Sequence, residues 1–256
     1  MTKTKARRPV DLNGTVMGDG SYLLCVPITG VTSDGIIDEV TAAVAKKADM
    51  LEWRIDAWEK YPDIDEALSL LSRIRDIDGK IPILLTTRSK REGPNPDEED
   101  ISDDDKFALI DALANTGLCE AFDVEYFYGK AVISAVSEKL HKKNCKLLVS
   151  LHVKSGVLDA SGIEEVLSNM QDWGGDIAKL CVFNETFADF FWFINRIKDA
   201  RDSYIDIPMV TAAAADNTGI SRALGDVWGT DMIFVTSDGS RQPGIEELRK
   251  FRDMIW

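Results

Sequence analysis

A lysine lies in the middle of an apolar run that is typical of a buried strand. The run is DIAKLCVF, residues 176–183, and Lys179 is its one cation. A lysine is seldom buried without a partner or a chemical task, and apolar neighbours favour the uncharged amine by lowering its pKa. A neutral amine attacks a carbonyl carbon and forms a Schiff base, so Lys179 is a candidate nucleophile. A lysine that reaches the surface or forms an ion pair is the alternative.

A histidine stands near the end of another apolar run, KLLVSLHV at residues 146–153. Histidine is the usual acid–base group near neutral pH, which makes His152 the candidate proton carrier, with a structural histidine as the alternative. The chain has two histidines. The other, His141, falls in the expected last turn of a helix, where a cation is favoured, and it needs no function.

Charged residues also enter two earlier strand-like runs. In LEWRID, Glu52, Arg54 and Asp56 are spaced by two, which predicts one polar side of a strand. That side lines a pocket in which Glu52 or Arg54 binds substrate, or it forms a structural ion network. In TTRSKREG, Arg88 can hold a carboxylate bidentately, and Glu92, four residues on, can orient a neighbouring base. A salt bridge in a surface loop is the alternative there.

The elements that must position these residues alternate along the chain. Strands are expected at residues 22–28, 48–56, 81–88, 121–127, 146–153, 176–183, 207–214 and 231–237. Helical spacing of apolar residues predicts helices at 36–47, 64–77, 104–116, 130–143, 161–172, 186–200, 217–226 and 245–254. Eight such units in about 230 residues fit a single-domain (β/α)8 barrel, whose catalytic residues lie at the C-terminal ends of the strands. An open doubly wound sheet is the runner-up, but no Gly-rich phosphate motif follows the first strand.

The ends of the barrel can be assigned from the same pattern. We expect residues 21–256 to form the catalytic barrel and residues 1–20 to form a tail and a cap at its N-terminal end. The basic start, MTKTKARRP, lacks the apolar segment of a signal peptide. No apolar run approaches the ~20 residues that span a bilayer, so no membrane association is expected.

Composition excludes several other classes of function. A net charge of −14 at pH 7 disfavours binding to nucleic acid or to an anionic membrane. The four cysteines form no C-x-x-C pair, which predicts reduced core residues in a cytoplasmic protein. The histidine spacing matches no zinc site, and the acidic segment 94–105 lacks the glycine and closing glutamate of a calcium loop, so no metal is expected.

Together these stretches resemble the type I 3-dehydroquinate dehydratases, also called type I dehydroquinases. The resemblance runs from about Tyr22 to the C-terminus and rests on CVPITG, ADMLEWRID, TTRSKREG, FDVEY, SLH, DIAKLCVF, GISRALGDVWG and DMIFVT. It implies a (β/α)8 fold and the dehydration of 3-dehydroquinate to 3-dehydroshikimate in the shikimate pathway. The reaction needs no metal or added cofactor, the substrate is a small anionic cyclic hydroxy-ketone, and the enzyme is a homodimer.

The resemblance also implies a role for each candidate residue. Lys179 attacks the C3 ketone, and His152 removes the C2 proton and then assists loss of the C1 hydroxyl as water. Glu92 orients His152. The resemblance assigns substrate binding to five residues: Glu52, Arg54, Arg88, Arg222 and Gln242.

Three stretches depart from the family pattern. Relatives usually carry methionines in the seventh strand, where this chain has Thr211 and Ala213, and the segment after His152 lacks the usual Thr-Pro. The final loop reads Ser-Arg-Gln-Pro-Gly-Ile at 240–245 instead of Ser-Ala-Pro-Gly-Gln. Two alternatives therefore stay open: a related Schiff-base lyase for another β-hydroxy ketone, and a non-catalytic ligand-binding relative.

Overall fold

The computed structural model gives the backbone of most of the chain. It describes residues 4–93, 100–154, 158–183, 186–214, 222, 224–236 and 244–255, without the side chains of residues 214, 226, 253 and 255. The strands expected from the sequence fall within these ranges, apart from residue 237. The expected helix at 217–226 lies mostly outside the described residues.

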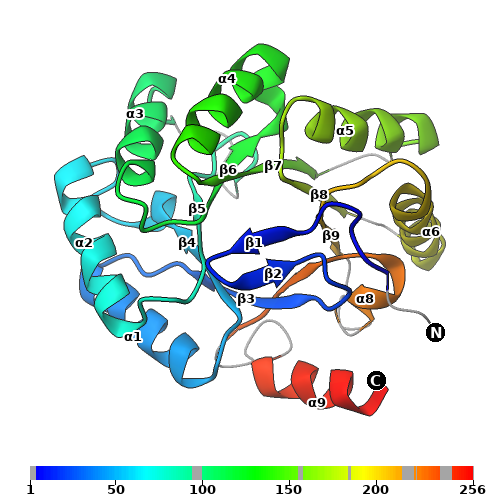
Figure 1. The fold of residues 1–256 in the computed structure, drawn as a ribbon, viewed down its shortest axis with the longest axis horizontal. Helices are drawn as coiled ribbons and strands as arrows, with labels where there is room; N and C mark the ends of the chain where they lie inside the picture. The colour runs from blue at the N-terminus through cyan, green and yellow to red at the C-terminus, as the bar shows by residue number, and fades with distance from the viewer. Residues whose placement is uncertain are drawn as a thin grey trace.

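Eight parallel strands form a cylinder, as Figure 1 shows. Their order is β10-β3-β4-β5-β6-β7-β8-β9, so each strand from β4 to β9 pairs with its predecessor in the chain, and β10 pairs with β3. The predicted (β/α)8 barrel is therefore confirmed. The strands are β3 (Leu23–Ile28), β4 (Met50–Arg54), β5 (Ile83–Thr86), β6 (Ala121–Glu125), β7 (Lys146–Val153), β8 (Ile177–Phe183), β9 (Met209–Ala214) and β10 (Met232–Phe234).

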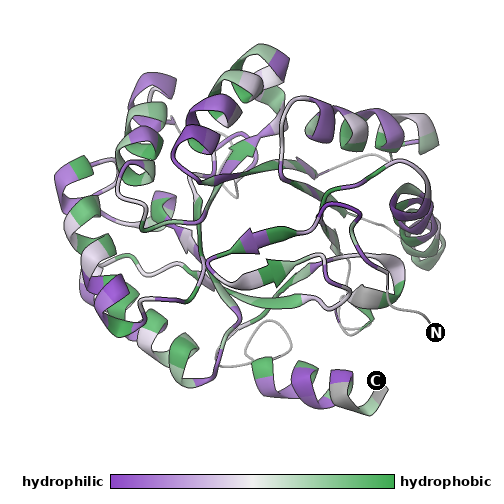
Figure 2. Ribbon diagram, viewed as in Figure 1, coloured by the Kyte–Doolittle hydropathy of each residue, from purple (hydrophilic) through white to green (hydrophobic). Residues whose placement is uncertain are grey.

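Helices surround the cylinder and turn their apolar sides toward it (Figure 2). Five of them begin after a capping residue. The side chain of that residue accepts a hydrogen bond from the backbone N–H three residues later in the chain, which stabilises the first turn. These capping residues are Thr32, Asp63, Ser102, Asp159 and Thr186. The helices are α1 (Ser33–Ala45), α2 (Ile64–Ile77), α3 (Asp103–Ala114), α4 (Gly129–Lys142), α5 (Ala160–Asp172), α6 (Phe187–Ser203), α8 (Gly225–Trp228) and α9 (Ile245–Ile255), with 3-10 turns η1 (Ile55–Ala57) and η2 (Tyr126–Tyr128).

Alternate residues of each strand point outward and inward, which divides the apolar core into two parts. Outward residues such as Leu51 and Leu180 pack against the helices. Inward residues at the starts of the strands, such as Met50 and Leu148, fill the N-terminal end of the cylinder. In strands β4 to β8, the next inward position carries a polar side chain.

A hairpin closes the N-terminal end of the barrel. Strands β1 (Val10–Leu12) and β2 (Thr15–Met17) pair antiparallel and lie across the middle of the ring in Figure 1. Asn13 and Gly14 both have positive φ, 55° and 91°, as a two-residue hairpin turn requires. Leu12 and Met17 are fully buried among the inward residues of the barrel. Burial of such side chains contributes about 2 kcal/mol each, which holds the hairpin in place.

One backbone hydrogen bond and two hydrogen bonds to side chains close the barrel between β9 and β10. Within the described residues, β9 and β10 share no ladder. Instead, Asp231 N–H donates to the Met209 carbonyl at 2.7 Å, and Met209 N–H donates to the Asp231 carboxylate at 2.8 Å. Thr211 N–H donates to the Thr230 hydroxyl at 2.9 Å. We refer to these four residues as the β9–β10 seam.

Candidate active site

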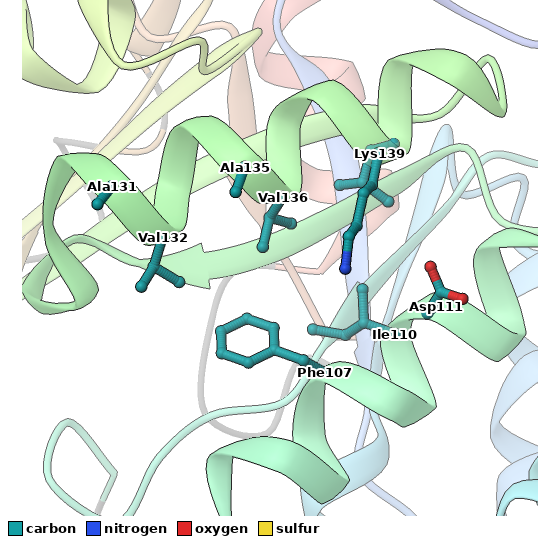
Figure 3. Close-up of a pocket in the computed structure, with 9 residues that line it drawn as sticks. Phe107, Ile110, Asp111, Ala131, Val132, Ala135, Val136 and Lys139 are labelled. Carbon is teal, nitrogen blue, oxygen red and sulfur yellow. The ribbon is translucent and has the colours of Figure 1, made fainter.

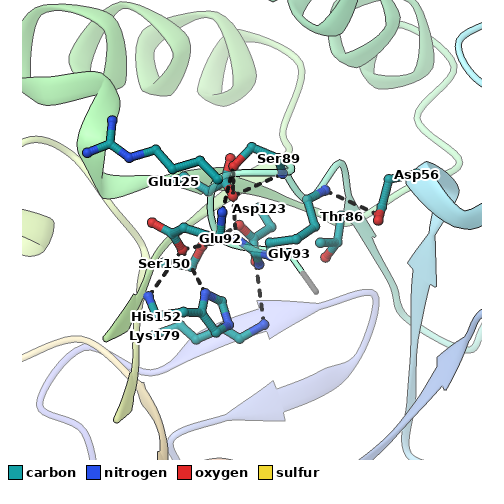
Figure 4. Close-up of polar contacts among 12 residues, drawn as sticks. Asp56, Thr86, Ser89, Glu92, Gly93, Asp123, Glu125, Ser150, His152 and Lys179 are labelled. Atoms are coloured by element: carbon teal, nitrogen blue, oxygen red, sulfur yellow. Dashed lines mark hydrogen bonds and ion pairs between the residues drawn. The ribbon is translucent and has the colours of Figure 1, made fainter. Parts of the chain in front are cut away.

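Polar side chains replace apolar ones inside the barrel toward the C-terminal ends of the strands. Glu52, Thr86, Asp123, Ser150 and Lys179 all point inward and are almost fully buried. Thr86 donates to Glu52 at 2.9 Å, and Ser150 donates to Asp123 at 2.6 Å. Figure 4 shows Thr86, Asp123, Ser150 and Lys179 converging with other polar side chains. We define the lumen cluster as Glu52, Arg88, Glu92, Asp123, Glu125, His152 and Lys179.

The structure places Lys179 in the middle of β8 with its amine inside the cylinder. The side chain is 4% exposed, and Nζ lies 3.3 Å from a Glu52 oxygen and 3.5 Å from an Asp123 oxygen. Its other near contact is the Phe234 ring, 4.6 Å from Nζ to the ring centre. The neighbourhood of the amine is thus ionic as well as apolar.

The pKa of Lys179 is raised above its ordinary value, so the expectation of a lowered pKa is wrong. Burial by itself lowers the pKa, but the charges of Glu52 and Asp123 outweigh it. Apolar strand neighbours alone suggested the opposite sign, because the sequence does not reveal which carboxylates other strands contribute. Asp123 responds in turn: burial raises its pKa, but Arg88 and Lys179 outweigh burial and lower the pKa to about 2.

His152 and Glu92 meet near the rim of the cylinder. His152 Nδ1 lies 2.8 Å from a Glu92 carboxylate oxygen, and His152 backbone N–H donates to the same oxygen at 3.1 Å. Burial, followed by the charges of Arg88 and Lys179, lowers the pKa of His152 to about 2, so the imidazole is neutral. When Glu92 is ionised, Nδ1–H donates to it and Nε2 keeps a free lone pair.

Glu92 itself titrates near neutrality. Burial raises its pKa to about 7, with Glu125 and Asp123 adding to the rise and Arg88 opposing it. The ionisation of Glu92 therefore decides which nitrogen of His152 can accept a proton. Glu92 is thus the member of this pair that titrates close to pH 7.

Arg88 holds the carboxylates of the lumen cluster together. Its guanidinium donates to Asp123 at 2.7 Å and to Glu125 and Ser150 at 3.0 Å each, and it lies 3.6 Å from Glu92. The side chain is 5% exposed. Protein carboxylates already occupy the donors of Arg88. The main effect of this arginine is therefore to hold the neighbouring side chains in place.

Arg54 and Arg222 lie closer to the opening. Arg54, 25% exposed, donates to both oxygens of Asp56, which follows the strand in η1 instead of continuing it. Arg222 donates to the Phe234 carbonyl at 3.2 Å, and no carboxylate pairs with it among the described residues. Burial lowers the pKa of Arg222. An unpaired guanidinium in a cavity is suited to hold an anionic group.

The cavity beside Arg222 has a volume of about 50 Å³ and lies along the β9–β10 seam. Thr211 and Ala213, the two positions that depart from the family pattern, both line it, together with Ala212. Short side chains therefore surround Arg222 on the β9 side. Gln242 lies outside the described residues.

Sequence reasoning did not single out three buried polar residues of the site. Asp123 and Glu125 lie two apart in β6, the same spacing that identified Glu52 and Arg54, and that spacing was the available signal. Ser150, two residues before His152, donates to Asp123 and accepts from Arg88. A lone serine in an apolar run gives no comparable signal.

Three further observations concern the rest of the described chain. No group of three or more His, Cys, Asp or Glu side chains in the described ranges is arranged to hold a metal ion. No helix within those ranges is long and apolar enough to cross a membrane. A groove of about 350 Å³ between α3 and α4 lies on the outside of the barrel (Figure 3). Its lining is mostly apolar and includes Phe107 and Val136, with none of the lumen cluster.

A (β/α)8 barrel with a buried lysine, a neutral histidine and a histidine-bound carboxylate at its C-terminal end fits the class of Schiff-base-forming lyases. Residues 24–255 match the family model described as Type I 3-dehydroquinase, and the chain belongs to that family. The resemblance inferred from the sequence is thereby confirmed.

Relatives match over nearly their whole length. The 3-dehydroquinate dehydratase of Syntrophotalea carbinolica is 32% identical over 246 residues, which cover 96% of both chains. The enzyme of the same name from Klebsiella pneumoniae is 30% identical and covers 96% of this chain and 97% of its own. The crystal structure of the type I enzyme from Clostridium difficile, with covalently modified comenic acid, has a TM-score of 0.91 at 30% identity and covers 97% of each chain.

Proposed function

We propose that the protein dehydrates 3-dehydroquinate to 3-dehydroshikimate through an imine formed at Lys179. Membership of the type I family gives the reaction, a hydro-lyase step of the Schiff-base class. The observation that carries the residue assignment is the burial of Lys179 within the barrel, beside the strand that bears His152, the partner of Glu92. Neither alternative, a lyase for another ketone or a non-catalytic relative, is favoured by these comparisons.

Lys179 must lose a proton before it attacks, because Glu52 and Asp123 keep the resting amine charged. We assign the neutral imidazole of His152 as the acceptor. It lies on the adjacent strand, two residues beyond Ser150, the register partner of Lys179. The free amine then adds to the C3 carbonyl, and a proton moves from nitrogen to oxygen to give a carbinolamine. Protonated His152 returns its proton to the carbinolamine hydroxyl, which leaves as water, and an iminium remains.

The elimination then uses the same imidazole a second time. The iminium withdraws electrons from C2, and neutral His152 removes the C2 proton to form an enamine. The electron pair expels the C1 hydroxyl, which takes the proton from His152 and leaves as water. Ionised Glu92 stabilises the imidazolium in this interval, because the two groups are in direct contact. Addition of water to the new iminium releases product and the amine of Lys179.

We propose that Arg222 binds the substrate carboxylate. Its side chain lines a cavity, and its guanidinium has no carboxylate partner among the described residues. Glu52, Arg54, Arg88 and Gln242 complete the proposed binding set for a small anionic cyclic hydroxy-ketone. We further propose a cytoplasmic homodimer in which residues 21–256 form the catalytic domain and residues 1–20 the cap. Sedimentation analysis tests the dimer.

Reduction with borohydride in the presence of 3-dehydroquinate tests the central assignment. We expect mass spectrometry to find a reduced adduct on the peptide that contains Lys179, and Lys179→Met to abolish both adduct and turnover. Lys146→Met is the matched control, because Lys146 opens strand β7 at the opposite end of the barrel. An adduct on any other lysine, or turnover in Lys179→Met, refutes the assignment.

A further inference from the structure

A second buried lysine lies behind the lumen cluster. Lys106, in the first turns of α3, is 2% exposed. Its Nζ makes no hydrogen bond within the described part of the chain. Its two near contacts are a Glu125 carboxylate oxygen at 3.5 Å and the Tyr128 ring, with 5.5 Å from Nζ to the ring centre. Burial of an ammonium is unfavourable by several kcal/mol, so a lysine without hydrogen bonds needs a reason to be there.

The contact with Glu125 gives that reason, because the two oxygens of this carboxylate have separate partners. Oε1 accepts three hydrogen bonds, from the Arg88 guanidinium at 3.0 Å, from Ser89 N–H at 3.0 Å and from the Ser89 hydroxyl at 2.7 Å. Oε2 faces Lys106. Lys106 is thus the cation on the outer side of a carboxylate whose inner side belongs to the site.

Carboxylates outnumber cations in the lumen cluster, and Lys106 reduces the excess from two to one. The cluster holds four carboxylates, Glu52, Glu92, Asp123 and Glu125, against the two cations Arg88 and Lys179. An uncompensated carboxylate in a buried site favours protonation of the nearest titrating acid. The acid that titrates near neutrality is Glu92, and after burial the charge of Glu125 is the largest contribution to its raised pKa.

We propose that Lys106 is a positioning residue for the dehydration: its ammonium offsets the charge of Glu125 and so keeps Glu92 ionised and hydrogen-bonded to His152. The inference rests on the proposed function, since it concerns the acid–base pair of that reaction. Glu92 is also faced by charged or titratable groups from several elements: Arg88 after β5, Asp123 and Glu125 of β6, and His152 of β7. Lys106 is the one that acts from a helix, through Glu125.

Lys106→Met tests the proposal, because methionine keeps most of the volume and removes the charge. We expect the acid limb of the kcat–pH profile to shift to higher pH by roughly one unit, because loss of a nearby positive charge raises the pKa of a carboxylic acid. That shift lowers kcat about ninefold at pH 6 and leaves it nearly unchanged at pH 9.5. Lys106→Arg keeps the charge and is expected to retain the wild-type limb.

Two controls separate charge from packing. Lys143 is another cation that contacts α3, through Asp111, but it lies outside the lumen cluster. The acid limb of the kcat profile of Lys143→Met is expected to match that of the wild type. Should Lys106→Met fail to fold, Lys106→Gln provides the same comparison. An equal loss of kcat at every pH, or an arginine variant that behaves like the methionine variant, overturns the proposal. Borohydride trapping on Lys179 is run in parallel. Absence of an adduct in the wild type refutes the proposed function. An adduct in the wild type, together with kcat–pH profiles of wild type and Lys106→Met that coincide, refutes only the role of Lys106.

Discussion

Replacement of Glu92 by glutamine tests the acid–base pair most directly. Glutamine is nearly isosteric, and its amide oxygen can still accept the hydrogen bond from His152 Nδ1–H, but it carries no charge and does not titrate. At the observed 2.8 Å and an effective dielectric constant of about 20, the imidazolium–carboxylate attraction is about 6 kcal/mol. A neutral hydrogen bond that remains contributes about 1 kcal/mol. The protonated form of His152 therefore loses up to about 5 kcal/mol, between three and four powers of ten.

The assay is the pH dependence of kcat for wild type and Glu92→Gln. In wild type, activity rises with pH through about 7, because ionisation of Glu92 frees Nε2 of His152. We expect the variant to lose about 10³-fold in kcat above pH 8, within the range that general acid–base catalysis supplies. We also expect its limb near pH 7 to disappear. A variant that keeps this limb shows that another group titrates there, and the reasoning fails.

The same substitution has an opposite effect on stability. Folding raises the pKa of Glu92 from 4.5 to about 7, so the folded protein holds a proton that the unfolded chain releases. The contribution of Glu92 to the free energy of unfolding therefore falls as pH rises from 4.5 through 7. Above pH 7, the ionised side chain lowers the free energy of unfolding by about 3 kcal/mol. Denaturant titration at pH 8 is expected to find Glu92→Gln more stable than wild type, with the difference vanishing near pH 4.

Two further variants test the proton carrier and the barrel closure. His152→Ala is expected to lose at least roughly 10²-fold in kcat while borohydride still traps an adduct with 3-dehydroquinate; wild-type turnover would contradict its role. Arg201→Met is expected to lower the free energy of unfolding by about 3–5 kcal/mol, because Asp231 is then a buried charge without its partner. Arg73→Met, at an exposed pair with Asp34, is the control and is expected to change stability by about 0.5 kcal/mol. Equal effects of the two arginine variants in denaturant titration contradict this account of the buried pair.

The sequence predicts the barrel well because the fold depends on a repeated pattern. Each strand lies within its expected range, and the helix over 64–77 has the predicted bounds. Local signals such as the capping residues Asp63 and Ser102 set helix starts, and these are visible in the chain. The hairpin within residues 10–17 is less evident, because its strands are only three residues long.

The electrostatics of the site could not be predicted from the sequence to the same degree. The ionisation of Lys179 depends on Glu52 and Asp123, which lie 127 and 56 positions away in the chain. Apolar neighbours in one strand indicate burial but not which charges the other strands bring. Lys106 illustrates the same limit: on α3 it has the sequence context of a solvated helix start, yet it is buried against Glu125.

At the β9–β10 seam, one hydrogen bond depends on the ionisation of an acid. Met209 N–H donates to the carboxylate of Asp231, whose pKa burial raises to about 6. Acidification through that value protonates the acceptor and weakens this bond. We therefore expect low pH to loosen the barrel at the β9–β10 seam, next to Arg222, the residue proposed to bind the substrate carboxylate.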